Sequence, residues 1–144
     1  NSLAAGSGFE RLTVIDGSKC ILCGLCVQAC NSLGTGAIST VNRGTDKKID
    51  TPYDKASPAC VGCLSCAHVC PTDAIPFEEG QGKRVIWNRA FDLVYCQDCG
   101  AVMGTRESVE FSAVKTGAQT VPIVCDACRK KSMADQMMAT YRFV

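Results

Sequence analysis

Aromatic side chains, histidine and long apolar runs are scarce in this sequence. Its 144 residues include one histidine and one tryptophan, and 6% of them are aromatic. No run of 18 apolar residues occurs, so we expect no membrane-spanning segment. Glycine-rich phosphate loops are also missing, and no cysteine stands outside a group, which removes the usual nicotinamide sites and thiol nucleophiles. The sequence therefore predicts that the chain is not an enzyme by itself.

An excess of charge of either sign is absent as well. Fifteen Lys and Arg face 14 Asp and Glu, for a formal net charge of +1. Basic residues occur only in short groups such as 129–131, which does not indicate a nucleic-acid partner. Residues 1–8 are small and polar, so no secretory signal is indicated. Because closely spaced cysteine pairs serve metals better than disulfides, we expect a cytoplasmic location.

Cysteine is abundant, in three groups of four. The first two groups repeat the spacing C-x2-C-x2-C-x3-C, which is the ligand run of [4Fe–4S] ferredoxins. In two-cluster ferredoxins the fourth cysteine of each run binds the other run's cluster. We therefore expect one cluster on Cys20, Cys23, Cys26 and Cys70, and a second on Cys30, Cys60, Cys63 and Cys66.

These two runs belong to a duplicated segment. Residues 20–30 align with residues 60–70 at an offset of 40, and residues 36–38 align with 73–75 at an offset of 37. Three extra residues near Gly34 to Gly36 account for the difference. The duplication predicts an α+β fold with a ferredoxin-like core of two β-α-β units.

The third group differs in spacing. It consists of two C-x2-C pairs, Cys96 with Cys99 and Cys125 with Cys128, separated by 25 residues. Four sulfurs in this arrangement suit Zn²⁺, a single iron or a [4Fe–4S] cluster. We favour a third [4Fe–4S] cluster, because the chain already carries two, and keep zinc as the alternative, which the glycine after Cys99 supports.

The chain divides into a two-cluster domain over residues 1–82 and a strand-rich metal-binding extension over residues 83–144 that ends in a helix. Ser132 resembles the cap of that helix, with Asp135 three residues later. Strands are expected at 12–15, 37–41, 83–87 and 91–95, and a polar surface loop at 42–58.

The sequence also predicts where several apolar and aromatic side chains and the single histidine lie. The stripe of Met133, Met137, Met138 and Tyr141 is interpreted first as ordinary packing and second as a docking surface. His68 is interpreted as a packed or surface residue rather than a ligand, and Trp87 and Tyr95 as packing near metal. The side chains expected to keep the clusters dry are Ile21, Leu22, Val27, Ile38, Val61, Val69 and Ile75.

From Leu12 to Phe77, the eight cysteines and the Cys70-Pro71-Thr72-Asp73-Ala74-Ile75 segment resemble a known module. It is similar to the two-cluster ferredoxin domain of iron-only hydrogenases and of the large iron–sulfur subunit of NADH dehydrogenases. That resemblance implies two [4Fe–4S] clusters and an electron relay. The catalytic domain that follows this module in the hydrogenases has no counterpart here, so hydrogen chemistry is not implied.

In size and cluster number the chain is also similar to electron-transfer subunits of molybdenum or tungsten oxidoreductases, such as aldehyde oxidoreductases and tungsten-containing benzoyl-CoA reductases. This implies a larger catalytic redox subunit as partner, along with other electron carriers. The expected function is an iron–sulfur subunit that relays single electrons through low-potential clusters. Two alternatives remain: a freely diffusing ferredoxin, and a redox-sensing interaction module with a structural zinc site.

Overall fold

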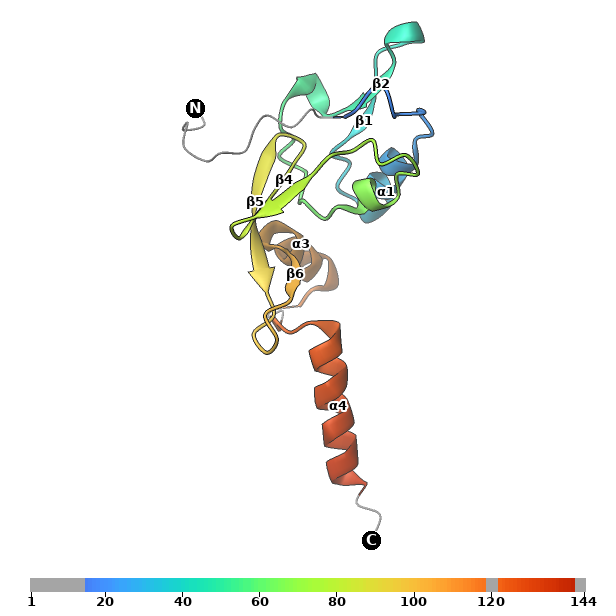
Figure 1. Ribbon diagram of the computed structural model, residues 1–144. Helices are drawn as coiled ribbons and strands as arrows, with labels where there is room; N and C mark the ends of the chain where they lie inside the picture. The colour runs from blue at the N-terminus through green and yellow to red at the C-terminus, as the bar shows by residue number, and fades with distance from the viewer. Residues whose placement is uncertain (1–14, 119–121, 142–144) are drawn as a thin grey trace.

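A computed structural model describes residues 15–118 and 122–141 (Figure 1). The strand expected at 12–15 lies outside these residues except for Ile15. The helices are α1 (Leu25–Leu33), α2 (Ser65–His68), α3 (Arg106–Thr116) and α4 (Asp126–Thr140), with short 3-10 turns at Gly44–Asp46 and Pro52–Asp54. The strands are β1 (Ser39–Val41), β2 (Lys48–Asp50), β3 (Glu78–Gly80), β4 (Lys83–Ile86), β5 (Arg89–Tyr95) and β6 (Val102–Thr105).

The two cysteine runs share one backbone path. Left-handed residues recur at positions that the sequence offsets align, and α1 and α2 each begin directly after one of them. Non-glycine residues avoid this region, so its repetition marks a shared local fold rather than chance. The aligned pairs, with their φ angles, are Leu22 (56°) and Gly62 (65°), Gly24 (76°) and Leu64 (63°), and Gly36 (56°) and Asp73 (50°).

The segment 42–58 is more than the surface loop expected from its polarity. It contains β2, which pairs antiparallel with β1. Ile49 in the middle of β2 is 1% exposed and belongs to the hydrophobic core. A single apolar residue among polar neighbours gives little periodicity, so this strand was not predicted from the sequence.

The second half of the chain forms a four-stranded antiparallel sheet in the order β3-β4-β5-β6. The strands expected at 83–87 and 91–95 are present as β4 and β5. Ile86 and Phe91 from this sheet and Trp87 from the turn between β4 and β5 join one hydrophobic cluster with residues of the duplicated segment, including Ile38 and Ile75. One core therefore crosses the expected boundary between residues 82 and 83.

Helix α3 ties the extension to the first cysteine run. Thr105 caps it through a reciprocal pair of hydrogen bonds with Ser108. Near its other end, the Lys115 ammonium donates to the carbonyl of Leu33 in the last turn of α1. A cation at the C-terminus of a helix is favourable, since the carbonyls there carry partial negative charge.

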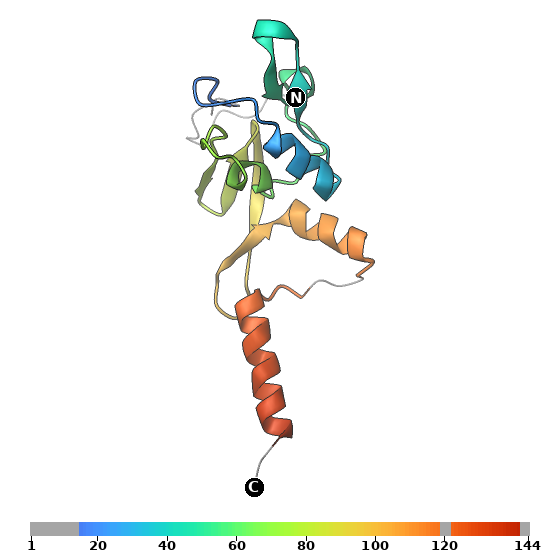
Figure 2. The same cartoon turned by 90° about the vertical axis from the view of Figure 1, so that its right-hand side faces the viewer.

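Helix α4 projects away from the rest of the chain in both views (Figures 1 and 2). It begins at Asp126, capped by Cys125, and not at Ser132 as expected. The Cys125 sulfur accepts the Cys128 N–H at 3.5 Å, so the Cys125 thiol has the capping role that the sequence predicted for the Ser132 hydroxyl. The methionine stripe is exposed, from 57% at Met133 to 76% at Met138, so the packing interpretation is wrong within the described residues.

None of the helices in the described part of the chain combines the length and apolar character needed to cross a membrane.

Gly62 offers a test of how tightly the second cysteine run packs on the sheet. A Cβ at this position would lie 2.7 Å from the Phe91 ring and 3.0 Å from the Thr105 methyl group. Gly44 has nearly the same φ, 64° against 65°, but open space around it. We expect Gly44→Ala to cost about 1 kcal/mol from backbone strain alone. Gly62→Ala should add about 1–3 kcal/mol from overlap.

The measurement is the thermal unfolding midpoint of the two variants, prepared anaerobically and matched for iron content. Equal midpoints would contradict the tight packing of Phe91 on the second run.

Candidate metal centres

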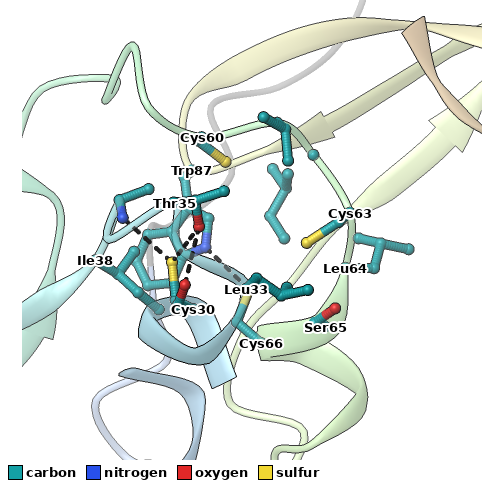
Figure 3. Close-up of a pocket in the computed structure, with 14 residues that line it drawn as sticks. Cys30, Leu33, Thr35, Ile38, Cys60, Cys63, Leu64, Ser65, Cys66 and Trp87 are labelled. Carbon is teal, nitrogen blue, oxygen red and sulfur yellow. Dashed lines mark hydrogen bonds between the residues drawn. The ribbon is translucent and has the colours of Figure 1, made fainter. Parts of the chain in front are cut away.

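The second cysteine run and the fourth cysteine of the first run enclose one pocket (Figure 3). Cys30 comes from α1, whereas Cys60, Cys63 and Cys66 come from the loop before α2 and its first turn. Apart from the cysteines its wall is largely apolar, with Ile38, Leu64, Ile86 and Trp87.

A second pocket brings together the other four cysteines of the two runs. It is lined by Cys20, Cys23, Cys26 and Cys70. Ile15, Ile49 and Ile75 complete its apolar wall. The structure thus sorts the eight thiols into two sets of four, with each fourth cysteine in the pocket of the other run.

The two fourth cysteines have matching surroundings. The Cys30 sulfur accepts the Ala37 N–H at 3.2 Å, and the Cys70 sulfur accepts the Ala74 N–H at 3.3 Å. A threonine hydroxyl lies beside each sulfur: Thr35 at 3.0 Å from Cys30, and Thr72 at 3.6 Å from Cys70. All of these partners correspond at the offset of 37 residues. Donors aimed at sulfur stabilise a thiolate ligand.

Trp87 contributes a donor that the sequence did not reveal. Its indole Nε1–H lies 3.4 Å from the Cys66 sulfur while its ring lies in the core (Figure 3). Burial raises the pKa of the Cys66 thiol to about 12, although the indole opposes that shift. Burial likewise raises the pKa values of Cys60 and Cys26. These thiols need a nearby positive charge, such as iron, to ionise at neutral pH.

Side chains of the sheet hold the second cysteine loop through its carbonyl groups. One nitrogen of Arg89 donates to the carbonyls of Ser57, Pro58 and Cys60 at 2.8–3.2 Å. Further along the loop, the carbonyl of Val61 accepts from the Thr105 hydroxyl, and that of Gly62 accepts from Arg84 at 2.8 Å. Arg84 is itself paired with Glu79 at 2.6 Å.

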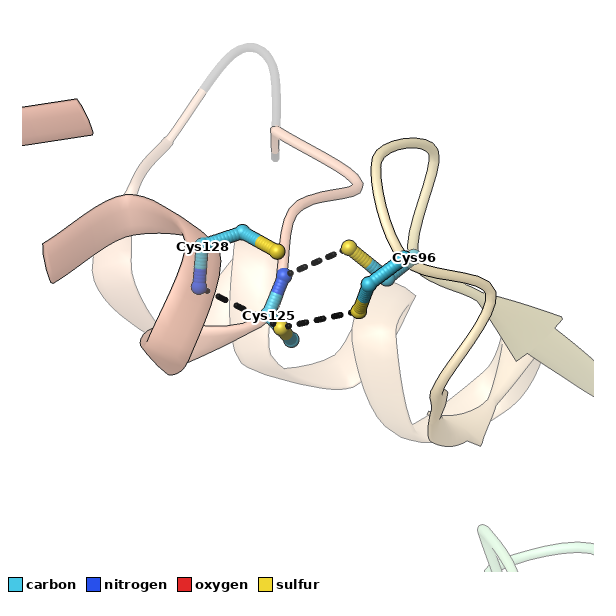
Figure 4. Close-up of side chains that lie close together, drawn as sticks. Cys96, Cys125 and Cys128 are labelled. Atoms are coloured by element: carbon cyan, nitrogen blue, oxygen red, sulfur yellow. Dashed lines mark hydrogen bonds between the residues drawn. The ribbon is translucent and has the colours of Figure 1, made fainter. Parts of the chain in front are cut away.

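The third group of cysteines lies at the far end of β5 (Figures 1 and 4). Cys96 and Cys99 belong to the turn between β5 and β6, and Cys125 and Cys128 to the start of α4. The four sulfurs lie within 4.8 Å of one another, and those of Cys99 and Cys125 are 3.5 Å apart. No other group of three or more thiols in residues 15–118 and 122–141 is as compact.

Backbone amides surround this group. The Cys96 sulfur accepts the Cys125 N–H at 3.3 Å. Together with the N–H groups of Cys99 and Asp98, this contact lowers the pKa of Cys96 to about 6. The thiolate that a metal requires is therefore favoured at one ligand before any ion binds.

Some residues with expected roles lie elsewhere. Leu22 and Val69 are exposed and line neither pocket, whereas Ile21 lines the pocket of Cys20, Cys23, Cys26 and Cys70 although it is largely exposed. Tyr95 is 43% exposed. His68 is exposed, near the Phe77 ring and outside both pocket linings, in agreement with its interpretation as a non-ligand. Ile49 and Ile86 take part in the shielding instead.

Comparison with known proteins defines the class of the first half. Residues 13–77, less than half of the chain, match the family model of the 4Fe-4S dicluster domain. This segment contains all eight cysteines of the two pockets. The chain thus carries an iron–sulfur domain of the ferredoxin-like electron-transfer class.

The relatives are much larger proteins. A stretch of 63 residues is 38% identical to the NADP-reducing hydrogenase subunit HndD of Solidesulfovibrio fructosivorans, covering 42% of this chain and 11% of that subunit. A stretch of 65 residues is 38% identical to a protein provisionally named a formate dehydrogenase from Staphylococcus haemolyticus, covering 42% of this chain and 6% of that protein. A similarly named protein of Staphylococcus aureus is 36% identical over 67 residues, with 42% and 6% covered.

Arg89 should be required to keep the second cysteine loop in place. Replacement of Arg89 by Met leaves three carbonyls without their charged donor, so we expect a loss of about 1.5–3 kcal/mol in stability. Arg106→Met, at an exposed position, is the control. Thermal unfolding and iron content measure the effect, and equal behaviour of the two variants would contradict it.

Proposed function

We propose that the chain is an electron-transfer iron–sulfur subunit that relays single electrons between a carrier and a catalytic partner. The observation that carries the proposal is the sorting of eight thiols into two pockets. In this proposal one [4Fe–4S] cluster is held by Cys20, Cys23, Cys26 and Cys70, and the other by Cys30, Cys60, Cys63 and Cys66. When bound, such clusters supply one-electron redox chemistry.

The residues around each pocket suit this role. Apolar side chains such as Ile38 and Ile75 keep water from the cluster positions. The N–H groups of Ala37, Ala74 and Trp87 point at ligand sulfurs, where they would stabilise the added negative charge of the reduced state. The chain itself thus sets the potential, while the donor and acceptor come from outside.

A permanent partner is supported by the extension. Helix α4 offers an exposed stripe of methionines, a side chain suited to protein contacts. We propose a larger catalytic oxidoreductase subunit in the cytoplasm; the resemblance noted above suggests a tungsten or molybdenum enzyme such as an aldehyde oxidoreductase or benzoyl-CoA reductase. For the third group, the sequence favoured another [4Fe–4S] cluster, whereas its short sulfur separations favour the zinc alternative.

Native anaerobic purification tests the partner. We expect a stable complex of fixed stoichiometry with a large subunit. The metals to be measured in this complex are tungsten, molybdenum and nickel. Isolation as a monomer under conditions that preserve complexes would instead favour a freely diffusing ferredoxin.

Potentiometric titration tests the relay. We expect two centres with midpoint potentials on the order of −400 mV or below, as in many ferredoxin-type proteins. Centres that all titrate well above 0 mV would argue against a low-potential relay.

Crossed ligation can be tested with variants from opposite halves of the chain. Trp87→Phe removes an N–H that donates to the Cys66 sulfur, and Thr35→Val removes a hydroxyl that lies 3.0 Å from the Cys30 sulfur. Either substitution should make the midpoint potential of the same centre more negative, because the sulfurs of Cys66 and Cys30 lie in one pocket. Thr72→Val should shift the other centre, and by less, given its longer 3.6 Å contact.

Spectroscopically monitored titration distinguishes the two centres, and Thr35→Ser, which keeps the hydroxyl, is the matched control. If Trp87→Phe and Thr35→Val shifted different centres, the crossed assignment would be wrong.

A further inference from the structure

The sulfur separations of the third group differ in kind from those of the two pockets. Cys20, Cys23, Cys26 and Cys70 line one pocket and Cys30, Cys60, Cys63 and Cys66 line another, and neither set forms a compact group of three or more thiols. The sulfurs of Cys96, Cys99, Cys125 and Cys128 instead converge within 4.8 Å. In a cubane each thiolate binds a different iron, so its ligand sulfurs stand far apart. Around one ion they stand close together.

The convergence matches the geometry of a single tetrahedral ion. Metal–sulfur bonds of about 2.3 Å place the four sulfurs about 3.8 Å apart. The Cys99 and Cys125 sulfurs are 3.5 Å apart, close to this value. An open groove does lie alongside α4, but Cys99 and Cys128 are the only members of the group that line it. It is therefore not an interior that a cluster would fill.

Local backbone geometry builds both halves of the group. Gly100, with φ 71°, lets the chain turn so that its N–H bonds the Cys96 carbonyl at 3.0 Å, while the Cys96 N–H bonds the carbonyl of Ala101 at 2.8 Å. This tight turn presents Cys96 and Cys99 to the same point. The other pair lies at the start of α4: Cys125 is the N-cap residue, and Cys128 lies three residues later in the first turn.

The 25-residue interval between the pairs does not count against zinc. It is longer than that of common zinc ribbons, but it contains β6 and α3, which pack on the sheet and on α1. The inserted helix lies outside the metal group. The two pairs are therefore brought together by the sheet and not by a short connection.

The group is also where α4 meets the body of the chain. Every residue of α4 is exposed except Cys128. Two backbone contacts join this region to the β5–β6 turn: the Gln97 N–H donates to the Ile123 carbonyl at 2.9 Å, and the Cys125 N–H to the Cys96 sulfur. A bond from each thiol to a shared ion would fasten the helix far more firmly.

We propose that Cys96, Cys99, Cys125 and Cys128 hold one structural zinc ion, which fixes the start of α4 to the β5–β6 turn, and that this site is not a station on the electron path. Binding displaces the thiol protons and forms four zinc–sulfur bonds, with no change of oxidation state. Zinc has no accessible redox couple, so the relay is confined to the two crossed pockets.

Metal analysis of the full chain, purified anaerobically from its native source, tests the proposal independently of the relay. We expect about eight iron and one zinc per chain, with X-ray absorption at the zinc edge showing four sulfurs at about 2.3 Å. About twelve iron without zinc would overturn it. A single iron at this group would overturn it as well.

Cys99→Ser separates the sites. It should abolish zinc binding and leave the iron content unchanged, whereas a third cluster would cost about four iron. Gln97→Ser, an exposed position in the same turn, is the control and should retain the zinc.

The fastening role has its own readout. Hydrogen exchange of residues 122–130 should become at least about tenfold faster in Cys99→Ser, while α1 stays unchanged. Unchanged exchange in 122–130 would overturn the fastening role, and faster exchange throughout would show a general loss of structure and overturn it too.

Discussion

The binding of the second cysteine loop to the sheet is the constraint on which the rest of the structure depends. A loop that wraps a metal site cannot pair its own carbonyls in a helix or strand, so those groups need donors from elsewhere. Arg89, Thr105 and Arg84 supply them, and Phe91 packs against Gly62 where a side chain would not fit. The extension thus shares one hydrophobic core with the cysteine runs, and residues of β4, β5 and β6 contact the second run directly.

The same sheet connects two sites of different chemistry. At one end of β5, Arg89 holds the loop of an apolar pocket whose thiols do not converge on one point; at the other end, Cys96 belongs to a compact group of thiols. Pockets lined by separated thiols, with matched N–H donors, suit clusters that gain and lose electrons with little rearrangement. A compact group fixed to a turn and a helix start suits an ion with a mechanical role. Helix α4, exposed along its length, is held by the second kind of site and presents the surface proposed for a partner.

Sequence reasoning succeeded where the signal was local. Spacing identified both cysteine runs, and the offsets of 40 and 37 aligned residues that share left-handed backbone, such as Gly24 with Leu64. It failed where burial depended on distant partners. Ile49 was predicted to be part of a polar loop, and Leu22 and Val69 were predicted to shield the pockets that they do not line. Ser132 was predicted to cap α4, although Cys125 has that position. The donor role of Trp87 had no sequence signal, since its partner Cys66 is 21 residues away.

By itself, the sequence determined the ligand type, the duplicated runs and the similarity of the first half to a 4Fe-4S dicluster domain, because these depend on residue identity at short spacing. Tertiary structure alone decided which sulfurs meet and how far apart they stand. The number of metal atoms that four thiols can hold depends on the distances between their sulfurs. In the third group, the sulfurs of Cys99 and Cys125 lie close together although β6 and α3 separate these residues in the sequence. Four cysteine ligands can therefore bind either a cluster or a single ion, depending on the distances between sulfurs that the fold sets.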